Sequence, residues 1–337
     1  MFIIILINTF ALLKSSLNKT ILRTFLFVLL FAVLVVASLA IGVKQISWLD
    51  FTNWKDSEAP VFFISRIPRT VALILAGVGL SISGLIMQQI SLNKFVSPTT
   101  AGTLDAAKLG ILISMILLPS IASLYRMGFA FLFTVLASII FMQMLKRIQH
   151  RSLIYIPLLG IMFGNVLAAI GTFFAYKFDI VQNMETWLIG DFSKILKGNY
   201  ELIYISLPIV ILTYIYANKL TTLGLGKDMA KSLGINYDLI VLVGLICVSL
   251  TVSSVMITAG AIPFLGLIVP NIVSLFYGDN LKRSLPITAL FGAILLLFCD
   301  IISRIIIYPY EIPIGLTIGI IGGVTFLVFI GKRMRYA

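Results

Sequence analysis

Charged side chains are scarce in this chain. They make up 11% of its 337 residues, whereas soluble proteins carry about a quarter. Hydrophobic residues make up 60%. This composition excludes an ordinary soluble domain, and we expect an all-α polytopic membrane protein.

Metal-binding and nucleophilic side chains are also rare. The sequence has one histidine, His150, and two cysteines, Cys247 and Cys299, which lie in separate apolar runs. Two isolated thiols in such runs are typical of packing residues rather than of a disulfide. The sequence shows no Cys/His cluster, no nucleophile–base arrangement and no phosphate-cradling glycine loop. We therefore expect no metal site, no catalytic residue and no cofactor, and ATP hydrolysis is not encoded here.

Windows without charge predict ten membrane spans in a single domain, residues 1–337. The window 239–278 would be about twice the hydrocarbon thickness as a helix, so it must turn, and Gly260 and Pro263 mark the place. The predicted spans are 24–43, 70–93, 109–125, 127–145, 152–176, 202–218, 239–258, 263–278, 284–307 and 312–331.

The net charge of +12 comes from basic loops between these windows. Lysine and arginine concentrate in alternate loops, among them 219–231 and 332–335, whereas Trp48, Trp54 and Trp187 fall in the other set. The positive-inside rule places the basic set in the cytoplasm, so both termini are expected there. This distribution indicates a membrane lipid environment and argues against a nucleic-acid partner.

Two charged pairs stand out near the ends of apolar windows. Arg66 and Arg69 are three residues apart at a helix start and are expected to point the same way, either to clamp a carboxylate or to anchor the helix to lipid headgroups. Asp300 and Arg304 are set i,i+4 inside an apolar run, where an unpaired charge is costly. They are expected to form an intramembrane ion pair that locks neighbouring helices, or to place Arg304 opposite a docking partner. The two interpretations are compatible.

Two polar stretches interrupt the apolar pattern. Residues 223–237, LGLGKDMAKSLGINY, predict a glycine-hinged turn and about two turns of amphipathic helix that end at Gly234. A short helix presented to the cytoplasm is a surface on which a partner protein can push. Residues 93–104, NKFVSPTTAGTL, predict irregular backbone, which membrane depth tolerates only where protein or water satisfies it. We expect this break to line a cavity or to re-enter from the inner side.

Four blocks of the sequence resemble those of a known family, in the same order. The blocks are RIPRTVALILAGVGLSISGLIMQQISLNKFVSPTTAG, GLGKDMAKSLGINY, AGAIPFLGLIVPNIVSLFYG and DIISRIIIYPYEIPIGLTIGIIGG. They are similar to the signatures of the FecCD-type permeases, which are membrane subunits of ABC importers for iron–siderophore complexes, haem and cobalamin. The resemblance covers about residues 47–333. The segment VSPTTAGTLDAAKLG is most similar to the corresponding segment of siderophore permeases.

This resemblance implies a ten-span subunit that works as a homo- or heterodimer with a second permease. Two cytoplasmic ATPase subunits, which carry the ATP and Mg, would lie below it, and an extracytoplasmic substrate-binding protein above it. It implies that Arg66, Arg69 and Arg304 meet carboxylates of the binding protein, and that Ser152, Leu153 and Ile154 form a cytoplasmic gate. The residues expected to couple the permease to the ATPase are Leu223, Gly226, Lys227, Asp228, Ala230, Leu233 and Gly234. The family commonly has an acidic residue where this chain has Lys227.

The function expected from these observations is ATP-driven import of a ferric siderophore through the cytoplasmic membrane by alternating access. A haem or cobalamin permease is the nearest alternative. An ion-coupled secondary transporter would need intramembrane ionisable groups, and only Asp300 and Arg304 qualify. A membrane-embedded enzyme would need convergent His, Asp or Glu residues, which the sequence does not show.

Overall fold

The structure is a computed structural model that describes residues 17–42, 58–147, 155–182, 184 and 189–335. These residues form helices and turns, with one isolated bridge between Ile307 and Tyr310. In chain order the helices are α2 (Leu17–Ala40), α3 (Glu58–Val61), the π-helical turn η1 (Phe62–Arg66), α4 (Ile67–Ser91), α5 (Thr103–Leu117), α6 (Ser123–Arg147), α7 (Tyr155–Lys177), the 3-10 turn η2 (Glu201–Ile205), α9 (Ser206–Ile215), α10 (Ala217–Leu223), α11 (Lys227–Ser232), α12 (Tyr237–Ala259), α13 (Leu265–Tyr277), α14 (Leu281–Ile305) and α15 (Ile314–Arg335).

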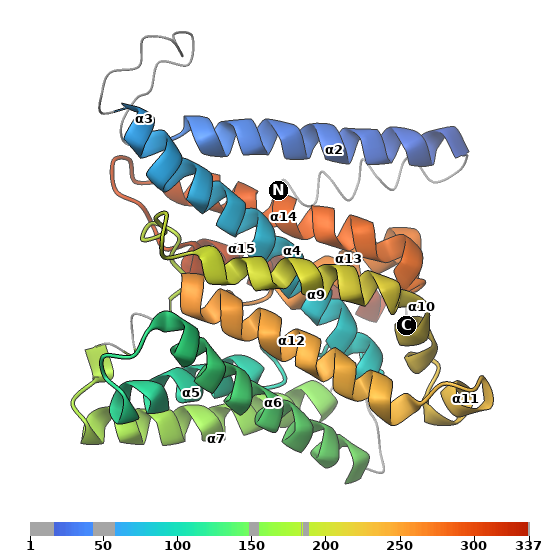
Figure 1. Cartoon of the computed structure of the whole chain (residues 1–337). Helices are drawn as coiled ribbons and strands as arrows, with labels where there is room; N and C mark the ends of the chain where they lie inside the picture. The colour runs from blue at the N-terminus through green and yellow to red at the C-terminus, as the bar shows by residue number, and fades with distance from the viewer. Residues whose placement is uncertain (1–16, 43–57, 148–154, 183, 185–188, 336–337) are drawn as a thin grey trace.

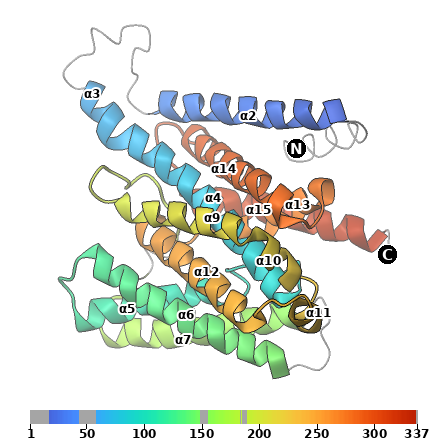
Figure 2. The same cartoon turned by 45° about the vertical axis from the view of Figure 1, so that its right-hand side comes forward.

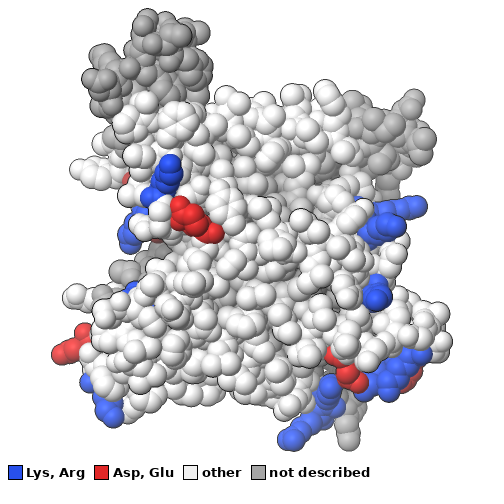
Figure 3. Space-filling view, in the orientation of Figure 1, with Lys and Arg blue, Asp and Glu red and all other residues white. Residues whose placement is uncertain are grey.

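The long helices lie roughly side by side in a layered bundle. Helix α14 packs between α2 and α4, and α12 packs between α4 and α6 (Figures 1 and 2). Helices α5, α6 and α7 form the layer farthest from α2. Charged side chains gather toward the two ends of the bundle and leave a broad uncharged belt between them (Figure 3). A belt of this kind matches the hydrocarbon core of a bilayer.

Helix α4 is the central element because small residues let its neighbours come close. A Cβ atom added to Gly77 would lie 2.6 Å from the carbonyl oxygen of Gly292 on α14, and one added to Gly84 would overlap the backbone of Gly266 on α13. Helix backbones reach such distances only where side chains are absent. Gly77 and Gly84 therefore lie on a packing surface of α4.

By length and composition, five described helices can cross a membrane, and the bent unit of η2 with α9 and α10 makes a sixth. That unit bends by 69° at its break. Three shorter apolar helices are also present: Thr24–Ala40, Leu265–Tyr277 and Ile314–Val328. By length and composition alone, the described helices therefore account for five or six of the ten predicted crossings.

Two boundaries predicted from the charge-free windows differ from those of the structure. The windows predict a break at Arg126, but the break lies at residues 118–122, where Pro119 follows the last turn of α5, so that Arg126 is inside α6. The windows predict that the second span begins at Thr70, but a continuous helical stretch begins at Ala59 and runs to Ser91. The helix ends differ from the ends of the charge-free windows because Arg126 and the arginines of this stretch are helical residues.

The irregular segment between α4 and α5 is held by side chains. Leu92 is left-handed, with φ of 54°. Gln88 Nε2 and Asn271 Nδ2 both donate to the Lys94 carbonyl oxygen, at 2.9 and 2.8 Å. The Thr103 hydroxyl donates to the carbonyl oxygen of Pro98 at 2.7 Å. Protein groups thus satisfy this backbone, as membrane depth requires.

Candidate functional site

One end of the bundle holds a network of charged side chains, and Arg69 on α4 is at its centre. Arg69 Nε and Nη2 donate to Asp300 Oδ1 at 3.2 and 2.7 Å. Arg69 Nη1 donates to Glu311 Oε2 at 2.6 Å. Arg304, one turn beyond Asp300 on α14, forms an ion pair with the other oxygen of Asp300. The ion pair between Asp300 and Arg304 is therefore present, and Arg69 joins it from a second helix.

The network also binds the C-terminal end of α2. Arg66 and Arg304 each donate through Nη1 to two carbonyl oxygens there. The last carbonyls of a helix lack intrahelical donors and carry partial negative charge, so two guanidinium groups are well suited to cap them. The acceptors are Leu39 and Ala40 for Arg66, at 2.8 and 2.9 Å, and Ser38 and Ile41 for Arg304, at 2.9 Å each.

Arg66 and Arg69 do not share a target. Arg66 points to the backbone of α2, whereas Arg69 points to the carboxylates of Asp300 and Glu311. The two arginines therefore do not form the common carboxylate clamp that their spacing suggests. They connect three helices instead.

The network is largely inaccessible to solvent. Asp300 is 0% exposed, and Arg66 and Arg304 are each 5% exposed. The side chains of Arg69 and Glu311 are 11% and 23% exposed. Buried charges of this kind are tolerated because they are paired and hydrogen-bonded. The arrangement can hold α2, α4 and α14 together, and it offers one partly accessible edge, at Arg69 and Glu311.

The polar segment 223–237 lies at the other end of the bundle. Gly226, with φ of 99°, precedes α11, and Gly234, with φ of 75°, follows it. These left-handed angles are ones that glycine adopts without steric cost. Asn236 then caps α12, its side chain accepting a hydrogen bond from Leu239 N at 3.2 Å. The glycine-hinged helix predicted from the sequence is formed by α11.

Helix α11 projects from the edge of the molecule (Figure 1). Its Ala230 is fully buried, whereas Met229 and Leu233 are 55% and 61% exposed. Charged side chains surround this edge (Figure 3), and Lys227 pairs with Asp238 at 3.9 Å. The segment therefore presents exposed apolar groups within a charged rim.

Two contacts join this segment and the adjoining helix α10 to the bundle. The Thr221 hydroxyl on α10 accepts from Leu281 N, the first residue of α14, at 3.1 Å. The amide group of Gln89 on α4 lies directly against Gly224, where a Cβ atom would overlap it. The segment is thus connected to α4 and α14, the same two helices that carry Arg69 and Asp300 at their other ends.

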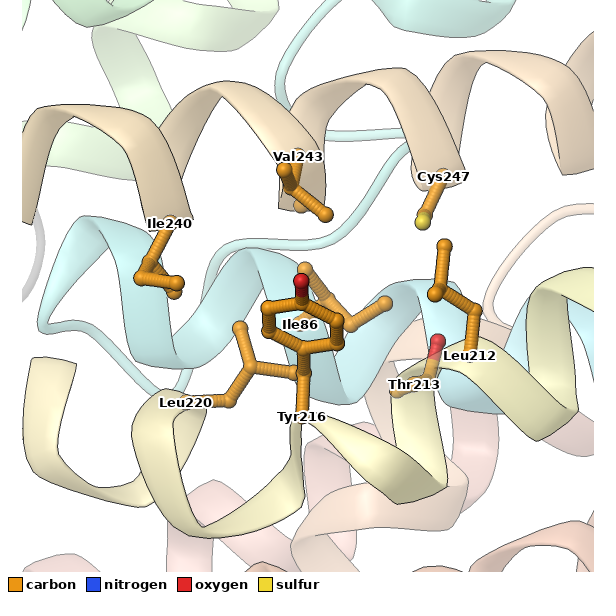
Figure 4. A pocket seen from close by; sticks show the side chains of 9 residues that line it. Ile86, Leu212, Thr213, Tyr216, Leu220, Ile240, Val243 and Cys247 are labelled. Carbon is orange, nitrogen blue, oxygen red and sulfur yellow. The ribbon is translucent and has the colours of Figure 1, made fainter.

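A narrow apolar crevice with an accessible volume of about 10 Å³ opens beside the bend between α9 and α10. Figure 4 shows the Tyr216 ring standing between α10 and α12 in this crevice, with Ile86, Ile240 and Cys247 around it. The lining carries no carboxylate and no cationic group. It is packing space at a kinked helix rather than a site for a charged ligand.

Several predicted features fall outside the described residues. These are the gate residues Ser152, Leu153 and Ile154, together with His150, Trp48, Trp54 and Trp187. Among the residues that the structure does describe, no group of three or more His, Cys, Asp or Glu side chains could hold a metal ion.

Comparison with known families identifies the chain's relatives. The model of the FecCD transport family matches residues 27–332. The chain belongs to this family. Among curated relatives, this FecCD protein is 53% identical to the petrobactin import system permease protein YclN of Bacillus subtilis, over 93% of this chain and 99% of that one. It is 47% identical to the ferric-anguibactin transport system permease protein FatD of Vibrio anguillarum, again over 93% of this chain and 99% of that one.

A solved structure shares the fold of this FecCD protein. It is an inward-facing conformation of a metal-chelate type ABC transporter, with a TM-score of 0.77 and 23% identity, covering 91% of this chain and 98% of the other. This match shows that the FecCD chain has the helical fold of an ABC transporter permease, and its transport role follows from the family match.

Sequence reasoning missed three residues that the structure places at these sites. Glu311 pairs with Arg69, Thr221 binds the start of α14, and Gln89 packs on Gly224. Each contact joins residues that are far apart in sequence. Of these three residues, only Glu311 could have been noticed in the sequence, because it is an acidic residue that follows Arg304 closely in a chain with few acidic residues.

Proposed function

We propose that this protein is the permease subunit of an ATP-driven importer that carries a ferric siderophore across the cytoplasmic membrane. The observation that carries this proposal is the near full-length similarity to permeases named for petrobactin and ferric anguibactin. Both names denote iron chelates, and the family match covers residues 27–332.

The proposed topology has ten spans, with both termini in the cytoplasm. The five long helices, the bent unit and the three shorter apolar helices supply nine of them, and α5, of 15 residues, supplies the tenth. Helices shorter than about 20 residues can cross where packed neighbours or a locally thinner bilayer compensate. Under this topology the arginine network faces outward and α11 faces inward, in agreement with the basic loops.

The proposed assembly contains a second permease subunit, two ATPase subunits with their ATP and Mg, and an extracytoplasmic binding protein. Closure of the ATPase dimer pushes on α11, whose exposed Met229 and Leu233 are suited to enter a cleft in the motor. The contacts at Thr221 and Gly224 pass this movement to the bundle, and access to a central pathway alternates. The segment 152–154 would close that pathway on the cytoplasmic side.

Arg66, Arg69 and Arg304 form the proposed docking site for the binding protein. Arg69 supplies the accessible edge, and Arg66 and Arg304 hold the helix ends that frame it. The role of the last two is to position the surface, because both are 5% exposed.

An uptake panel tests the proposed function. A strain lacking this gene, and the same strain carrying it on a plasmid, would receive radiolabelled iron bound to petrobactin or to anguibactin, and separately haem and cobalamin. We expect the plasmid to restore uptake of an iron–siderophore complex only, and to require an intact ATPase. Restored uptake of haem or cobalamin alone would show that the substrate is that compound and not an iron–siderophore complex. Uptake that survives loss of the ATPase but collapses with the proton gradient would indicate a secondary transporter.

A further inference from the structure

The arginine network reaches the surface at one guanidinium edge. Asp300 binds Nε and Nη2 of Arg69, whereas Nη1 donates to Glu311. The other members of the network, Arg66 and Arg304, are directed at α2 and are buried. Among the described residues of the network, Arg69 and Glu311 are therefore the two most accessible to a protein that approaches this end of the bundle, and Glu311 occupies Nη1 of Arg69.

Glu311 stands at the end of an exposed turn. All residues from Ile305 to Tyr310 are exposed, and Tyr310 is 76% exposed. The turn is closed by a hydrogen bond from Tyr310 N to the Ile307 carbonyl oxygen at 2.8 Å, and Ile312 N donates to the Ser303 carbonyl oxygen at 3.0 Å. The backbone on both sides of Glu311 is thus held in place without the help of its side chain.

The side chain of Glu311 can leave Arg69 at small cost to the fold. Asp300 keeps two hydrogen bonds to Arg69 when Glu311 swings away, so the guanidinium group remains paired. A second carboxylate could then take the position on Nη1. The exchange replaces one partly exposed ion pair by another and buries no additional unpaired charge, which is the costly outcome for a charge.

We propose that Glu311 is an internal stand-in for a carboxylate of the docking partner. In the free permease it occupies Arg69 Nη1, and in the complex an aspartate or glutamate of the binding protein displaces it. The exposed apolar turn 305–310 flanks the exchange site and contacts the same partner. This inference rests on the proposed docking function of Arg69, and it identifies Glu311 as a residue that sets the affinity of docking.

Removing the competitor should strengthen docking. In Glu311→Gln the internal pair loses its charge, while Arg69 keeps its bonds to Asp300. We expect the binding protein to bind the reconstituted permease–ATPase complex about two- to fivefold more tightly, the range that corresponds to a partly exposed ion pair. Titration of labelled binding protein against the complex in nanodiscs would measure this change.

Glu201→Gln is the matched control. Glu201 is an exposed acid whose carboxylate accepts hydrogen bonds from Gly198 N and Tyr200 N, and the neighbouring loop reaches η1 through a hydrogen bond from Lys197 N to the Ile64 carbonyl oxygen. The substitution removes the same charge near the same end of the bundle. The binding protein should bind this variant as tightly as it binds the wild type. Tighter binding by both variants would show that removing any negative charge at this end strengthens docking, and this result would refute the exchange of Glu311 for a partner carboxylate.

Two outcomes separate this inference from the function on which it rests. Wild-type complex that fails to bind the binding protein would refute docking itself, and the exchange with it. Wild-type binding together with unchanged or weaker binding by Glu311→Gln would refute the exchange alone. Glu311→Asp provides a second variant if the first folds poorly, because the shorter side chain withdraws the carboxylate from Arg69 and should act in the same direction.

Discussion

Replacing Asp300 with asparagine tests whether the charged network holds the bundle together. Asparagine keeps the size of the side chain but removes the negative charge that lies between Arg69 and Arg304. Asp300 is fully buried, so solvent does not screen its loss. Breaking a buried pair by removing one partner costs about 3 to 5 kcal/mol. Because Glu311 still pairs with Arg69, we expect a loss of about 3 kcal/mol, the lower end of that range.

Asp279→Asn supplies the comparison. Asp279 pairs with Lys94 at 2.8 Å, but the two side chains are 59% and 41% exposed. An exposed pair contributes about 0 to 1 kcal/mol. The two variants therefore make the same chemical change at a buried carboxylate with two arginine partners and at an exposed carboxylate with one lysine partner.

The free energy of unfolding would be measured for both variants by titration with sodium dodecyl sulfate in mixed micelles. We expect Asp300→Asn to lose at least twice as much stability as Asp279→Asn. Equal losses would show that the network contributes no more than a surface pair, and the proposed joining of α2, α4 and α14 would then be wrong.

Three further changes probe close packing and coupling. Gly84→Val should abolish accumulation of folded protein, because its side chain would overlap the backbone of Gly266; membrane yield measures this. Gly234→Val should leave yield unchanged but lower ATP-dependent uptake, because a β-branched residue strains a backbone with φ of 75°, at about 1 to 3 kcal/mol, within the proposed coupling segment. Thr221→Val should lower uptake per ATP hydrolysed several-fold by removing the acceptor for Leu281 N, and Thr221→Ser should restore it.

The controls for these variants come from the same chain. Gly128 lies inside α6, and a Cβ atom added there would meet no neighbouring atom within 4 Å, so Gly128→Val should resemble the wild type in both yield and uptake. Full uptake by Gly234→Val would contradict the coupling role of α11. Equal uptake by Thr221→Val and Thr221→Ser would show that the hydrogen bond between the Thr221 hydroxyl and Leu281 N is not needed to couple the segment to α14.

Features set by local pattern could be predicted from the sequence. The helix α11 follows from two glycines around a short amphipathic stretch, and the ion pair of Asp300 and Arg304 follows from i,i+4 spacing in an apolar run. The helical class follows from composition alone. In each case the deciding interactions lie within a few residues along the chain.

Features set by packing could not be predicted in this way. The target of Arg66 is the end of α2, and the second partner of Arg69 is Glu311, which is more than two hundred residues away. Charge-free windows also misplace helix ends where an arginine is helical, because they take a charge to mark the end of a span. At Arg126 the end of the preceding helix is set by the turn near Pro119 instead.

Helix α14 joins the two distant ends of the protein as one continuous helix. Its first residue donates a hydrogen bond to Thr221 beside the polar segment, and its last two turns carry Asp300 and Arg304. A helix of 25 residues is about 37 Å long. A tilt of about 5° pivoting at Leu281 would shift the far tip by roughly 3 Å, a full hydrogen-bond length. Small rotations at one end of the bundle are thereby magnified into the making or breaking of contacts at the other end.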